Sequence, residues 1–377
     1  MNNELEQIVT EVNKVVKGKE RVVRKVLAAV LAGGHVLLED IPGVGKTTLA
    51  MALGKSMDLE YKRMQFTPDV LPSDIVGFTM YNSRTGEFEY KQGAIFCNLF
   101  LADELNRTSS KTQSALLEVM EESKVTVDGI AHQLPNPFTV IATENPFGSS
   151  GTQMLPESQL DRFLICLNIG YPSHEAAVDI LRGSAGIGLN QVQSVISVER
   201  LLELRKLAAN LHVEDSVLEY ITNLAEATRQ DTRIALGVSP RGSIALLKMA
   251  RSMALMRGGD YVIPEDVRAV SAEVLRHRIG LTYEVEQYGA ENIVFFSELR
   301  QGSPFNALVS LTRDYDIYHI TGTNLAMLMA VIIERDDEDI SAEELCEAAM
   351  EAVEGSMLNV RQFLKEQIED CDEEEDL

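Results

Sequence analysis

The chain has 377 residues, of which 45% are hydrophobic and 24% charged, so it is long enough for two or three globular domains. Its formal net charge of −24, with no basic stripe, argues against nucleic acid as the main partner. Its longest apolar run, residues 325–333, is about half the roughly 20 residues that a membrane-spanning helix needs, and the N-terminus lacks the features of a signal peptide. We therefore expect a cytoplasmic protein without membrane insertion.

The first elements along the chain are helical. Apolar residues at helical spacing between residues 5 and 31 predict two helices, separated by a short loop at residues 16–19. The apolar run 35–38 predicts a buried strand, and residues 49–53 predict the next helix. The intervening loop therefore connects a buried strand to a helix.

This loop, residues 39–48, has the composition of a nucleotide-binding phosphate loop. Gly43 and Gly45 allow successive backbone N–H groups to point at phosphate oxygens. Lys46 can reach the β- and γ-phosphates, and the Thr47 hydroxyl can ligate Mg²⁺. The alternative is a plain Gly-Lys-Thr turn, because Asp40 stands where the usual pattern has a glycine. We expect ATP and Mg²⁺ to bind here, with the following candidate cofactor-binding residues: Gly18, Pro42, Gly43, Val44, Gly45, Lys46, Thr47 and Thr48.

The next segments predict a parallel sheet with inserted hairpins. Buried apolar runs alternate with helical segments, which favours a parallel sheet covered on both faces. The expected elements are a loop at 68–77, a β-hairpin at 78–90, a strand at 97–102, a helix at 111–122, a hairpin at 125–133 with Asp128-Gly129 as its turn, and strands at 138–143 and 163–167.

Two carboxylates, Asp103 and Glu104, end the strand at 97–102. Side chains alternate across a strand, so adjacent carboxylates cannot do the same job. Asp103 can hold the hydration shell of a Mg²⁺ ion beside Thr47, and Glu104 can orient and deprotonate an attacking water. Acids often follow strands for structural reasons, but the phosphate loop and the acid pair together predict nucleotide hydrolysis.

Polar residues at other strand and helix ends extend this set. Asn145 follows the strand at 138–143, where it can touch the γ-phosphate or the attacking water, although a lone Asn there is also a common turn residue. Arg162 precedes the strand at 163–167, and Arg241 lies at the start of a later helix. An arginine can stabilise charge on a transferring phosphoryl group, whereas an isolated one is more often a surface ion-pair partner. Arg107, just past the acid pair, is a third basic candidate.

The second half of the chain is helical in pattern. Ser197 and Ser239 are candidate N-caps, and Pro264 suits a first helical turn. Residues 341–344 form a capping-box pattern for a helix that runs to about residue 353. The expected helices of the second domain are residues 197–209, 213–229, 240–257 and 264–278.

The C-terminal part carries most of the acidic excess. From residue 334 onward, 18 acidic and 3 basic side chains give a net charge of −15. The run 369–376 repels itself, so we expect a disordered tail that either solvates the protein or docks to a basic partner. The segment after residue 302 is expected to be a partner-facing module. Alternatively, its apolar stripe, Leu325, Leu328, Met329 and Ile332, packs against the preceding helical domain.

In order and spacing, the phosphate loop, acid pair, asparagine, arginine and helical domain resemble those of AAA+ ATPases. Finer motifs resemble the MoxR branch, including Asp40 at the first-glycine position, and the similarity covers roughly residues 5 to 290. These motifs are GGHVLLED (33–40) with PGVGKT (42–47), QFTPD (65–69) with LPSD (71–74), ADELNR (102–107), ATENP (142–146), LDRF (160–163) and SPR (239–241).

The resemblance implies several properties that the spacing of the motifs alone does not predict. It implies a homo-hexameric ring with ATP at the subunit interfaces, and a hairpin inserted near residues 70–90. It makes Asn145 the sensor-one residue, Arg162 the finger that reaches a neighbour's γ-phosphate, and Arg241 the sensor-two arginine. It also suggests a chaperone-like role toward a protein client, often one with a von Willebrand A domain.

The sequence therefore predicts an α/β, parallel-sheet P-loop ATPase that remodels or activates a partner protein. The alternatives are a nucleotide-gated scaffold with little turnover, which the intact Glu104 disfavours, and a nucleic-acid-associated motor, which the acidic balance disfavours. The expected domains are a nucleotide-binding core (1–188), a helical lid (189–280), a connector (281–301), a helical extension (302–368) and an acidic tail (369–377).

Overall fold

The computed structural model describes residues 3–41, 43–145, 153–172, 174, 177–178, 189–231, 233–281, 294–297, 318–321, 327, 329–331 and 342–352. The chain divides into two compact units, residues 1–280 and 281–377, and each is described by itself. None of the helices in these described ranges is both long enough and apolar enough to cross a membrane.

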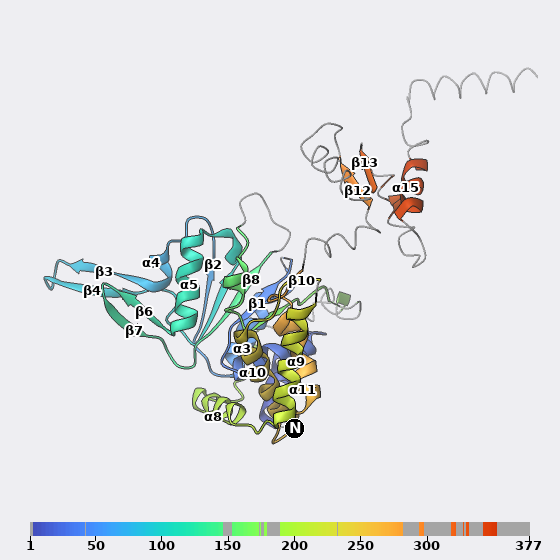
Figure 1. Cartoon of the computed structure of the whole chain (residues 1–377). Coiled ribbons are helices and arrows are strands. Elements are labelled where there is room, and N and C mark those ends of the chain that lie inside the picture. Colours follow the sequence, from blue (N-terminus) through green and yellow to red (C-terminus); the bar gives the residue numbers. More distant parts are fainter. Residues whose placement is uncertain are drawn as a thin grey trace, which may run out of the picture. The chain divides into compact units, whose positions relative to one another are not determined.

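A five-stranded parallel sheet forms the centre of the first unit (Figure 1), with the strand order β2-β5-β8-β1-β9. The predicted α/β fold class with a parallel sheet is therefore confirmed. The strands are β1 (Val36–Glu39), β2 (Tyr61–Gln65), β5 (Leu99–Asp103), β8 (Thr139–Glu144) and β9 (Ile165–Leu167). β2 was not predicted, because this edge strand is only partly buried and carries the adjacent charged residues Lys62 and Arg63, so it forms no apolar run.

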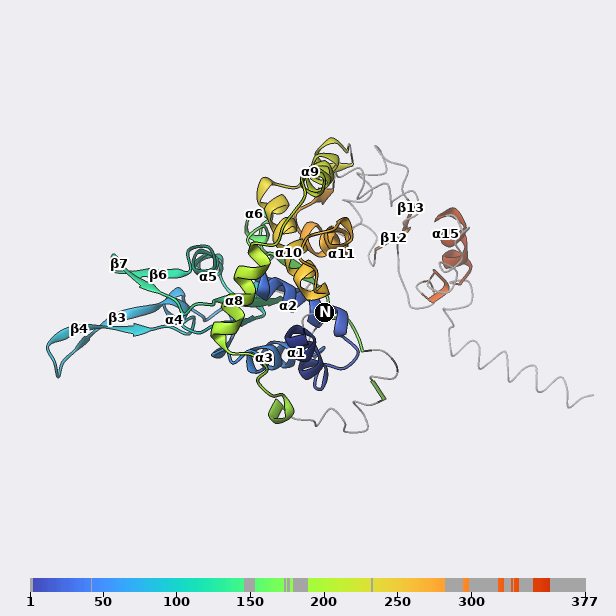
Figure 2. The same cartoon turned by 90° about the horizontal axis from the view of Figure 1, so that it is seen from below.

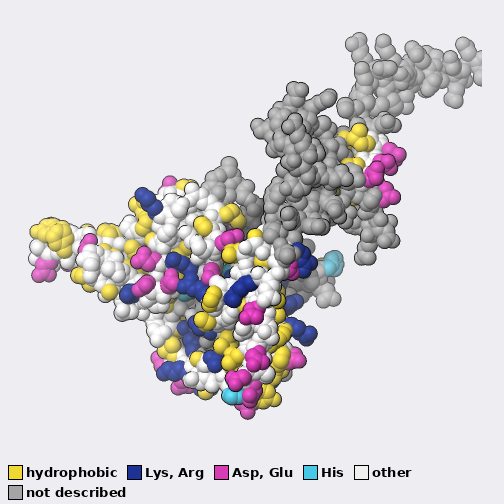
Figure 3. Space-filling view, in the orientation of Figure 1, with side chains coloured by type: hydrophobic (Ala, Val, Ile, Leu, Met, Phe, Trp, Pro, Cys, Tyr) yellow, Lys and Arg dark blue, Asp and Glu magenta, His cyan; other side chains and the backbone are white. Residues whose placement is uncertain are grey.

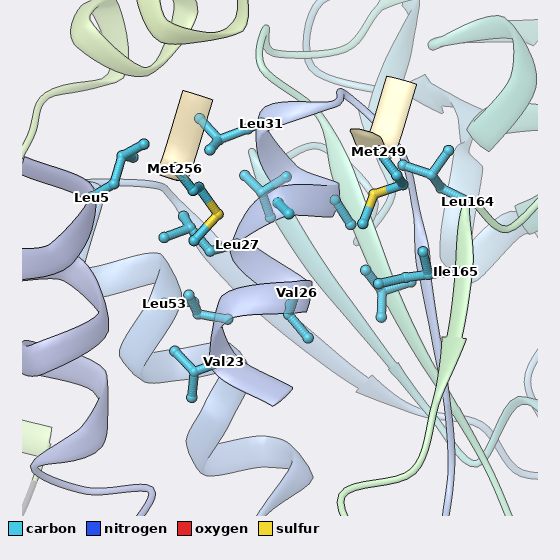
Figure 4. Close-up of a cluster of buried hydrophobic side chains, with 14 of the residues drawn as sticks. Leu5, Val23, Val26, Leu27, Leu31, Leu53, Leu164, Ile165, Met249 and Met256 are labelled. Carbon is cyan, nitrogen blue, oxygen red and sulfur yellow. The ribbon is translucent and has the colours of Figure 1, made fainter. Parts of the chain in front are cut away.

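Helices pack on the sheet through two apolar clusters. Because side chains alternate along a strand, Leu38 of β1 belongs to one cluster and Leu37 to the other. Figure 4 shows the first cluster, in which α2 side chains such as Leu27 lie among residues of α1, α3, β9 and α10. Burying one such leucine contributes about 1.5–3 kcal/mol. The helices of the α/β part are α1 (Asn3–Asn13), α2 (Glu20–Leu31), α3 (Lys46–Ser56), α4 (Pro72–Val76), α5 (Ser110–Glu122) and α6 (Glu157–Leu160).

Both predicted hairpins are present and project from the α/β core (Figure 1). The first pairs β3 (Gly77–Asn82) with β4 (Glu87–Gln92), and the second pairs β6 (Lys124–Val127) with β7 (Ile130–Gln133). The turn of the second hairpin needs positive φ at both central positions, and Asp128 (50°) and Gly129 (78°) supply it. The Asp-Gly signal in the sequence therefore fixed this turn.

Four long helices dominate the part after residue 188. They are α8 (Val198–Ala209), α9 (Asp215–Gln230), α10 (Pro240–Arg257) and α11 (Pro264–Leu275), close to the predicted ranges. The Ser197 and Ser239 hydroxyls accept N-cap hydrogen bonds from Arg200 N (3.3 Å) and Gly242 N (3.2 Å), as predicted. The part after residue 188 is not entirely helical, because the short strand β10 (Ile234–Leu236) pairs with β11 (Gly280–Leu281), which begins at the last residue of the unit. Two 3₁₀ turns lie at Leu105–Arg107 and Leu189–Gln191.

The described part of the second unit combines strands with helix. β12 (Val294–Ser297) pairs in parallel with β13 (Tyr318–Thr321), and α15 spans Ala342–Glu351. The expectation of helix throughout 302–368 fails at β13, because aromatic and β-branched residues favour strand there. Residue 341, the acidic tail and the stripe positions 325, 328 and 332 lie outside the described residues, while Met329 is half-exposed.

Candidate nucleotide-binding site

A cavity of about 370 Å³ lies where β1, β5 and β8 end, the position at which open parallel sheets bind ligands. The structure brings most of the predicted nucleotide-site residues together here, although they come from segments up to 102 positions apart. The lining residues are Gly43, Gly45, Lys46, Thr47, Thr48, Arg63, Gln65, Asp103, Glu104 and Asn145.

The phosphate loop places Lys46 at the floor of this cavity. Gly45 precedes α3 in the left-handed region (φ 97°), and an added side chain there would meet no atom within 4 Å, so backbone conformation rather than space requires glycine. The Lys46 Nζ donates to the carbonyl oxygen of Asp40 at 2.6 Å and to that of Glu144 at 3.5 Å. Burial lowers the pKa of Lys46, although the charges of Asp40, Asp103 and Glu104 oppose this shift. Two backbone carbonyls thus hold this ammonium group beside the loop.

Asp40, which replaces a glycine of the usual loop pattern, has a structural role. Its Oδ2 accepts hydrogen bonds from Ile169 N and Gly170 N, both at 2.6 Å, and its Oδ1 accepts one from Ile41 N at 2.9 Å. The side chain is 7% exposed. Asp40 therefore ties the start of the phosphate loop to the segment after β9, and a glycine could not make this connection.

Asp103 and Glu104 both line the cavity but have different partners. Asp103 Oδ2 accepts from Arg63 Nη2 at 2.7 Å, and its Oδ1 accepts from the Thr143 hydroxyl at 2.7 Å. Glu104 follows the strand in a left-handed conformation (φ 57°), and its Oε2 accepts from Arg107 Nη1 at 2.7 Å. A non-glycine residue in this region is uncommon and costs on the order of 1 kcal/mol, which often marks a functional position.

Two buried polar residues position this group. The Thr143 hydroxyl also accepts a hydrogen bond from Glu104 N at 2.8 Å, so one side chain contacts both members of the acid pair. Asn106 is fully buried, and its amide nitrogen donates to the carbonyl oxygen of Asn145 at 2.9 Å. Thr143 and Asn106 belong to the sequence motifs at 142–146 and 102–107, but the motifs alone predict no role for either residue.

Arg63 lines the cavity although nothing in the sequence predicts it there. It comes from β2, whose parallel register with β5 brings Arg63 and Gln65 beside Asp103. The Arg63 Nη2 contacts both the Asp103 carboxylate and the Gln65 Oε1, the latter at 2.8 Å. Since β2 was not predicted, nothing in the sequence placed this arginine near the acid pair.

Arg162 and Arg241 lie together in a different place. Arg162 Nη1 is 3.4 Å from the Glu121 Oε2, and Arg241 Nη2 donates to Glu121 Oε1. Both arginines line a cavity of about 290 Å³, which we call the arginine pocket. Neither is among the described residues that line the phosphate cavity. Their neighbour Asp161 instead pairs with the buried Arg278 at 2.6 Å.

The remaining candidate residues are not part of the described cavity lining. Gly18 makes a left-handed turn (φ 72°) before α2. Val44 packs at the edge of an apolar cluster, and Pro42 lies outside the described residues. These three positions therefore stay predictions.

A buried carboxylate, Glu144, ends β8 below the cavity. It is 1% exposed, and among the described residues no partner hydrogen-bonds its Oε1 atom. Burial raises the pKa of Glu144 to about 7, with a further contribution from the charge of Glu39 on the neighbouring strand. A carboxyl group in this environment retains its proton well above its usual range.

The residues present fit ATP with Mg²⁺. Phosphates need backbone donors, a cation and room, which the glycine loop, the N-terminus of α3 and Lys46 provide around the cavity. Magnesium prefers oxygen ligands, and Thr47, with its hydroxyl, and Asp103, with its carboxylate, both line this cavity.

Comparisons with known proteins identify the family of this chain. Residues 35–165 match the model of the ATPase family associated with various cellular activities (AAA), and residues 226–294 match that of the AAA lid domain. The chain is 50% identical over 293 residues to the uncharacterized protein YeaC of Bacillus subtilis, covering 77% of this chain and 92% of that protein. It is 41% identical over 289 residues to chaperone MoxR1 of Mycobacterium tuberculosis, covering 74% and 76%.

A solved structure supports the same relationship. The crystal structure of a candidate ATPase from Cytophaga hutchinsonii superposes with a TM-score of 0.71 at 38% sequence identity. The superposition covers 84% of this chain and 95% of that one.

Proposed function

We propose that this chain, which belongs to the MoxR family of AAA ATPases, binds ATP with Mg²⁺ in the phosphate cavity and hydrolyses it. The observation that carries the proposal is that Lys46, Thr47, Asp103, Glu104 and Asn145 all line one cavity at the carboxyl edge of the sheet. These are the residue types that phosphate binding, metal retention and water activation require.

The phosphate loop and Lys46 bind the phosphates of ATP. When ATP enters, the Lys46 ammonium exchanges its carbonyl contacts for β- and γ-phosphate oxygens, and the backbone donors at the start of α3 face the same oxygens. Magnesium, when bound, neutralises phosphate charge. Thr47 and Asp103 are the residues that would hold it, Asp103 through water.

Water activation falls to Glu104. Its carboxylate accepts a proton from the attacking water, a new bond forms between that oxygen and the γ-phosphorus, and the bond to ADP breaks. In the structure this carboxylate is paired with Arg107, so the pair must open before Glu104 can take the proton. Asn145, positioned by Asn106, is the amide that orients the water or the γ-phosphate.

The two arginines of the arginine pocket complete the site of a neighbouring subunit. Arg162 and Arg241 share one carboxylate, that of Glu121, and both are absent from the described lining of their own phosphate cavity. An arginine that stabilises the transferring phosphoryl group contributes about 10³–10⁵ in rate. A homo-hexameric ring is the assembly in which every phosphate cavity receives such a pair from the next subunit.

A protein client is the proposed target of the motor. MoxR1, a 41% identical relative, is named a chaperone, which supports a remodelling role. A von Willebrand A domain protein is one class of partner that the resemblance of the sequence motifs implies. The β3–β4 hairpin carries exposed apolar side chains, and Figure 3 shows them gathered at its free end. Phe88 is 75% exposed and Tyr81 is 56% exposed. Exposed apolar patches of this kind mark interaction surfaces.

The central experiment measures phosphate release with and without Mg²⁺. We expect the wild type to turn over ATP, and Glu104→Gln to bind ATP but to lose about 10²–10⁴-fold in turnover, the usual contribution of a positioned base. Near-normal turnover of Glu104→Gln would place the base elsewhere. Absent wild-type turnover would favour a nucleotide-gated scaffold, and strong stimulation by DNA would favour a nucleic-acid motor.

A second experiment tests the client surface. The Glu104→Gln protein is used to hold the ATP-bound state, and its partners are recovered from the native source with and without the added changes Tyr81→Ser and Phe88→Ser. We expect the hairpin variant to lose a partner that the parent retains. Ile130→Ser, on the other hairpin, is the matched control because that side chain is 62% exposed. An unchanged set of partners would exclude the β3–β4 hairpin as the contact surface.

A further inference from the structure

A second cavity, of about 390 Å³, lies between the C-terminal end of α2, α8 and α10, and we call it the helix cavity. The three helices contact one another, and Figure 2 shows them side by side. The cavity is as large as the phosphate cavity but shares none of its lining residues. Its lining consists of Leu31, Ala32, Gly33, Leu202, Arg205, Lys206, Ala208, Ala209, Lys248, Arg251 and Ser252.

The charged residues that line the helix cavity are all positive. Four of its lining residues, Arg205, Lys206, Lys248 and Arg251, are cations, and none is a carboxylate. No ion pair within the described ranges involves any of these four side chains. In a chain with a net charge of −24, this local excess of positive charge is uncompensated.

Several polar atoms around the cavity are buried without a partner. Among the described residues, the Nε atoms of Arg205 and Arg251 and the hydroxyl of Ser252 have no hydrogen bond, and Ser252 is fully buried. Arg205 is held on its other side by a bond from Nη2 to the Thr139 hydroxyl at 3.0 Å. Burial lowers the pKa of Arg205 to about 10, with no carboxylate to offset it. Buried donors are rarely left unpaired in folded proteins, so these atoms point to a missing acceptor.

The remaining walls are apolar. Leu31 and Ala32 close one side, and Leu202, Ala208 and Ala209 of α8 close another. A simple hydrated anion would leave this surface uncovered. A ligand that satisfies the whole cavity therefore combines an anionic group with an apolar body.

We propose that the helix cavity binds a small organic anion, in which a phosphate or carboxylate group on an apolar body contacts Arg205, Arg251 and Ser252. This site is separate from the phosphate cavity, and its existence does not depend on ATP hydrolysis. Such a ligand would join α2 of the α/β core to α8 and α10. Since α10 also carries Arg241 in its first turn, occupancy would restrain the helix that presents this arginine.

The test uses 1-naphthyl phosphate as the probe and the full chain saturated with ADP and Mg²⁺, so that the phosphate cavity is already filled. Isothermal titration should show one site per chain, with inorganic phosphate and 1-naphthol, the two halves of the probe, each binding at least about tenfold more weakly. Arg251→Gln should weaken the probe about 10–100-fold, the range for a hydrogen bond to a charged group. Ser252→Ala should weaken it less, by about 3–10-fold.

Arg268→Gln is the matched control, because Arg268 is an exposed arginine of α11 that does not line the cavity. It should leave the affinity unchanged. Folding is checked by melting: Arg251→Gln removes an unpartnered donor, so its melting temperature without probe should not fall, while the rise caused by the probe should disappear.

Three results would overturn the proposal. The first is equal affinity of the probe for wild type and Arg251→Gln. The second is equally tight binding of inorganic phosphate, which would make the cavity a plain anion site. The third is loss of probe binding when chains assemble, combined with impaired assembly of the Arg251→Gln variant. This result would mean that carboxylates of a neighbouring subunit, and not a small molecule, fill the cavity.

Discussion

The phosphate cavity and the arginine pocket differ in how their charges are balanced. In the phosphate cavity each carboxylate has its own cation, Asp103 with Arg63 and Glu104 with Arg107, while Lys46 rests on backbone carbonyls. In the arginine pocket, Arg162 and Arg241 share one carboxylate, that of Glu121, while the other acid of the lining, Asp161, pairs with Arg278. The pocket therefore has spare positive charge for an anion from outside the subunit. The cavity, by contrast, can accept a phosphate-metal complex by exchanging partners that it already holds.

The largest expected effect concerns Arg162 of the arginine pocket and the rate of ATP hydrolysis. Arg162→Ala subunits should bind ATP but hydrolyse it about 10³–10⁵-fold more slowly, because we propose that each subunit supplies this arginine to the cavity of its neighbour. When they are mixed with Glu104→Gln subunits, some activity should return at interfaces that pair an intact Glu104 with an intact Arg162. The measurement is ATPase rate against mixing ratio, with mixed assemblies verified by tagged co-purification. If verified mixtures show no recovery at any ratio, the arginine pocket does not act across subunits.

The next effect concerns binding rather than chemistry. Lys46→Ala should lose tight nucleotide binding, because the main cation facing the phosphates is removed. ATP at 100 times its Kd stabilises a protein by about 2.7 kcal/mol, and this gain should be absent in the variant. Thermal melting with and without ATP measures it, with Lys55→Ala of the same helix as the control. An equal ATP-dependent shift in Lys46→Ala would contradict the phosphate-loop assignment.

The buried carboxyl group of Glu144 should make the stability of the protein depend on pH. The fold raises the pKa of this carboxyl from 4.5 to about 7, so the native state holds a proton that the unfolded chain has released across that window. Its contribution to stability is therefore fully present below about pH 4.5, falls as pH rises toward 7, and stays low above it.

Glu144→Gln should remove this loss, because the amide is neutral at every pH. At pH 8 the variant should be more stable than wild type by about 2 kcal/mol, from 1.36 kcal/mol per pKa unit reduced for partial relaxation of the buried site. At pH 4.5 the two proteins should be similar. Urea denaturation at both pH values gives the comparison. A difference that does not depend on pH would mean that Glu144 is not held protonated.

The smallest expected effect concerns Arg63 and the Mg²⁺ concentration that tight ADP binding requires. Arg63 is partly exposed and occupies the carboxylate that is expected to retain Mg²⁺, so Arg63→Gln should lower the Mg²⁺ concentration needed for half-maximal tightening of ADP binding. An exposed ion pair contributes about 0.2–1 kcal/mol, which corresponds to a shift of roughly 1.5–5-fold. Fluorescent ADP titrated with Mg²⁺ measures it, and Arg84→Gln on the β3–β4 hairpin is the control. A higher Mg²⁺ requirement in Arg63→Gln would instead assign Arg63 to direct phosphate binding.

Much of the fold follows from local sequence signals. The hairpin turn at Asp128-Gly129, the N-caps at Ser197 and Ser239, and the loop into α3 each depend on residues that are neighbours along the chain. Backbone conformations and first-turn hydrogen bonds are set over a few positions, so a single sequence reveals them. The strand that precedes Asp103 was equally clear, because it is continuously apolar.

The tertiary structure decided what these elements bring together. Arg63 meets Asp103 only through the register of β2 with β5, and Asp40 reaches Ile169 and Gly170 across 129 positions or more. The sharing of Glu121 by Arg162 and Arg241, and the cationic lining of the helix cavity, likewise join residues from separate elements. Charge balance depends on distances in space, and those distances are fixed by sheet register and helix packing rather than by spacing along the chain. The sequence by itself thus determined which charged and polar groups the chain carries. The packing determined which of these charges are paired and which remain available.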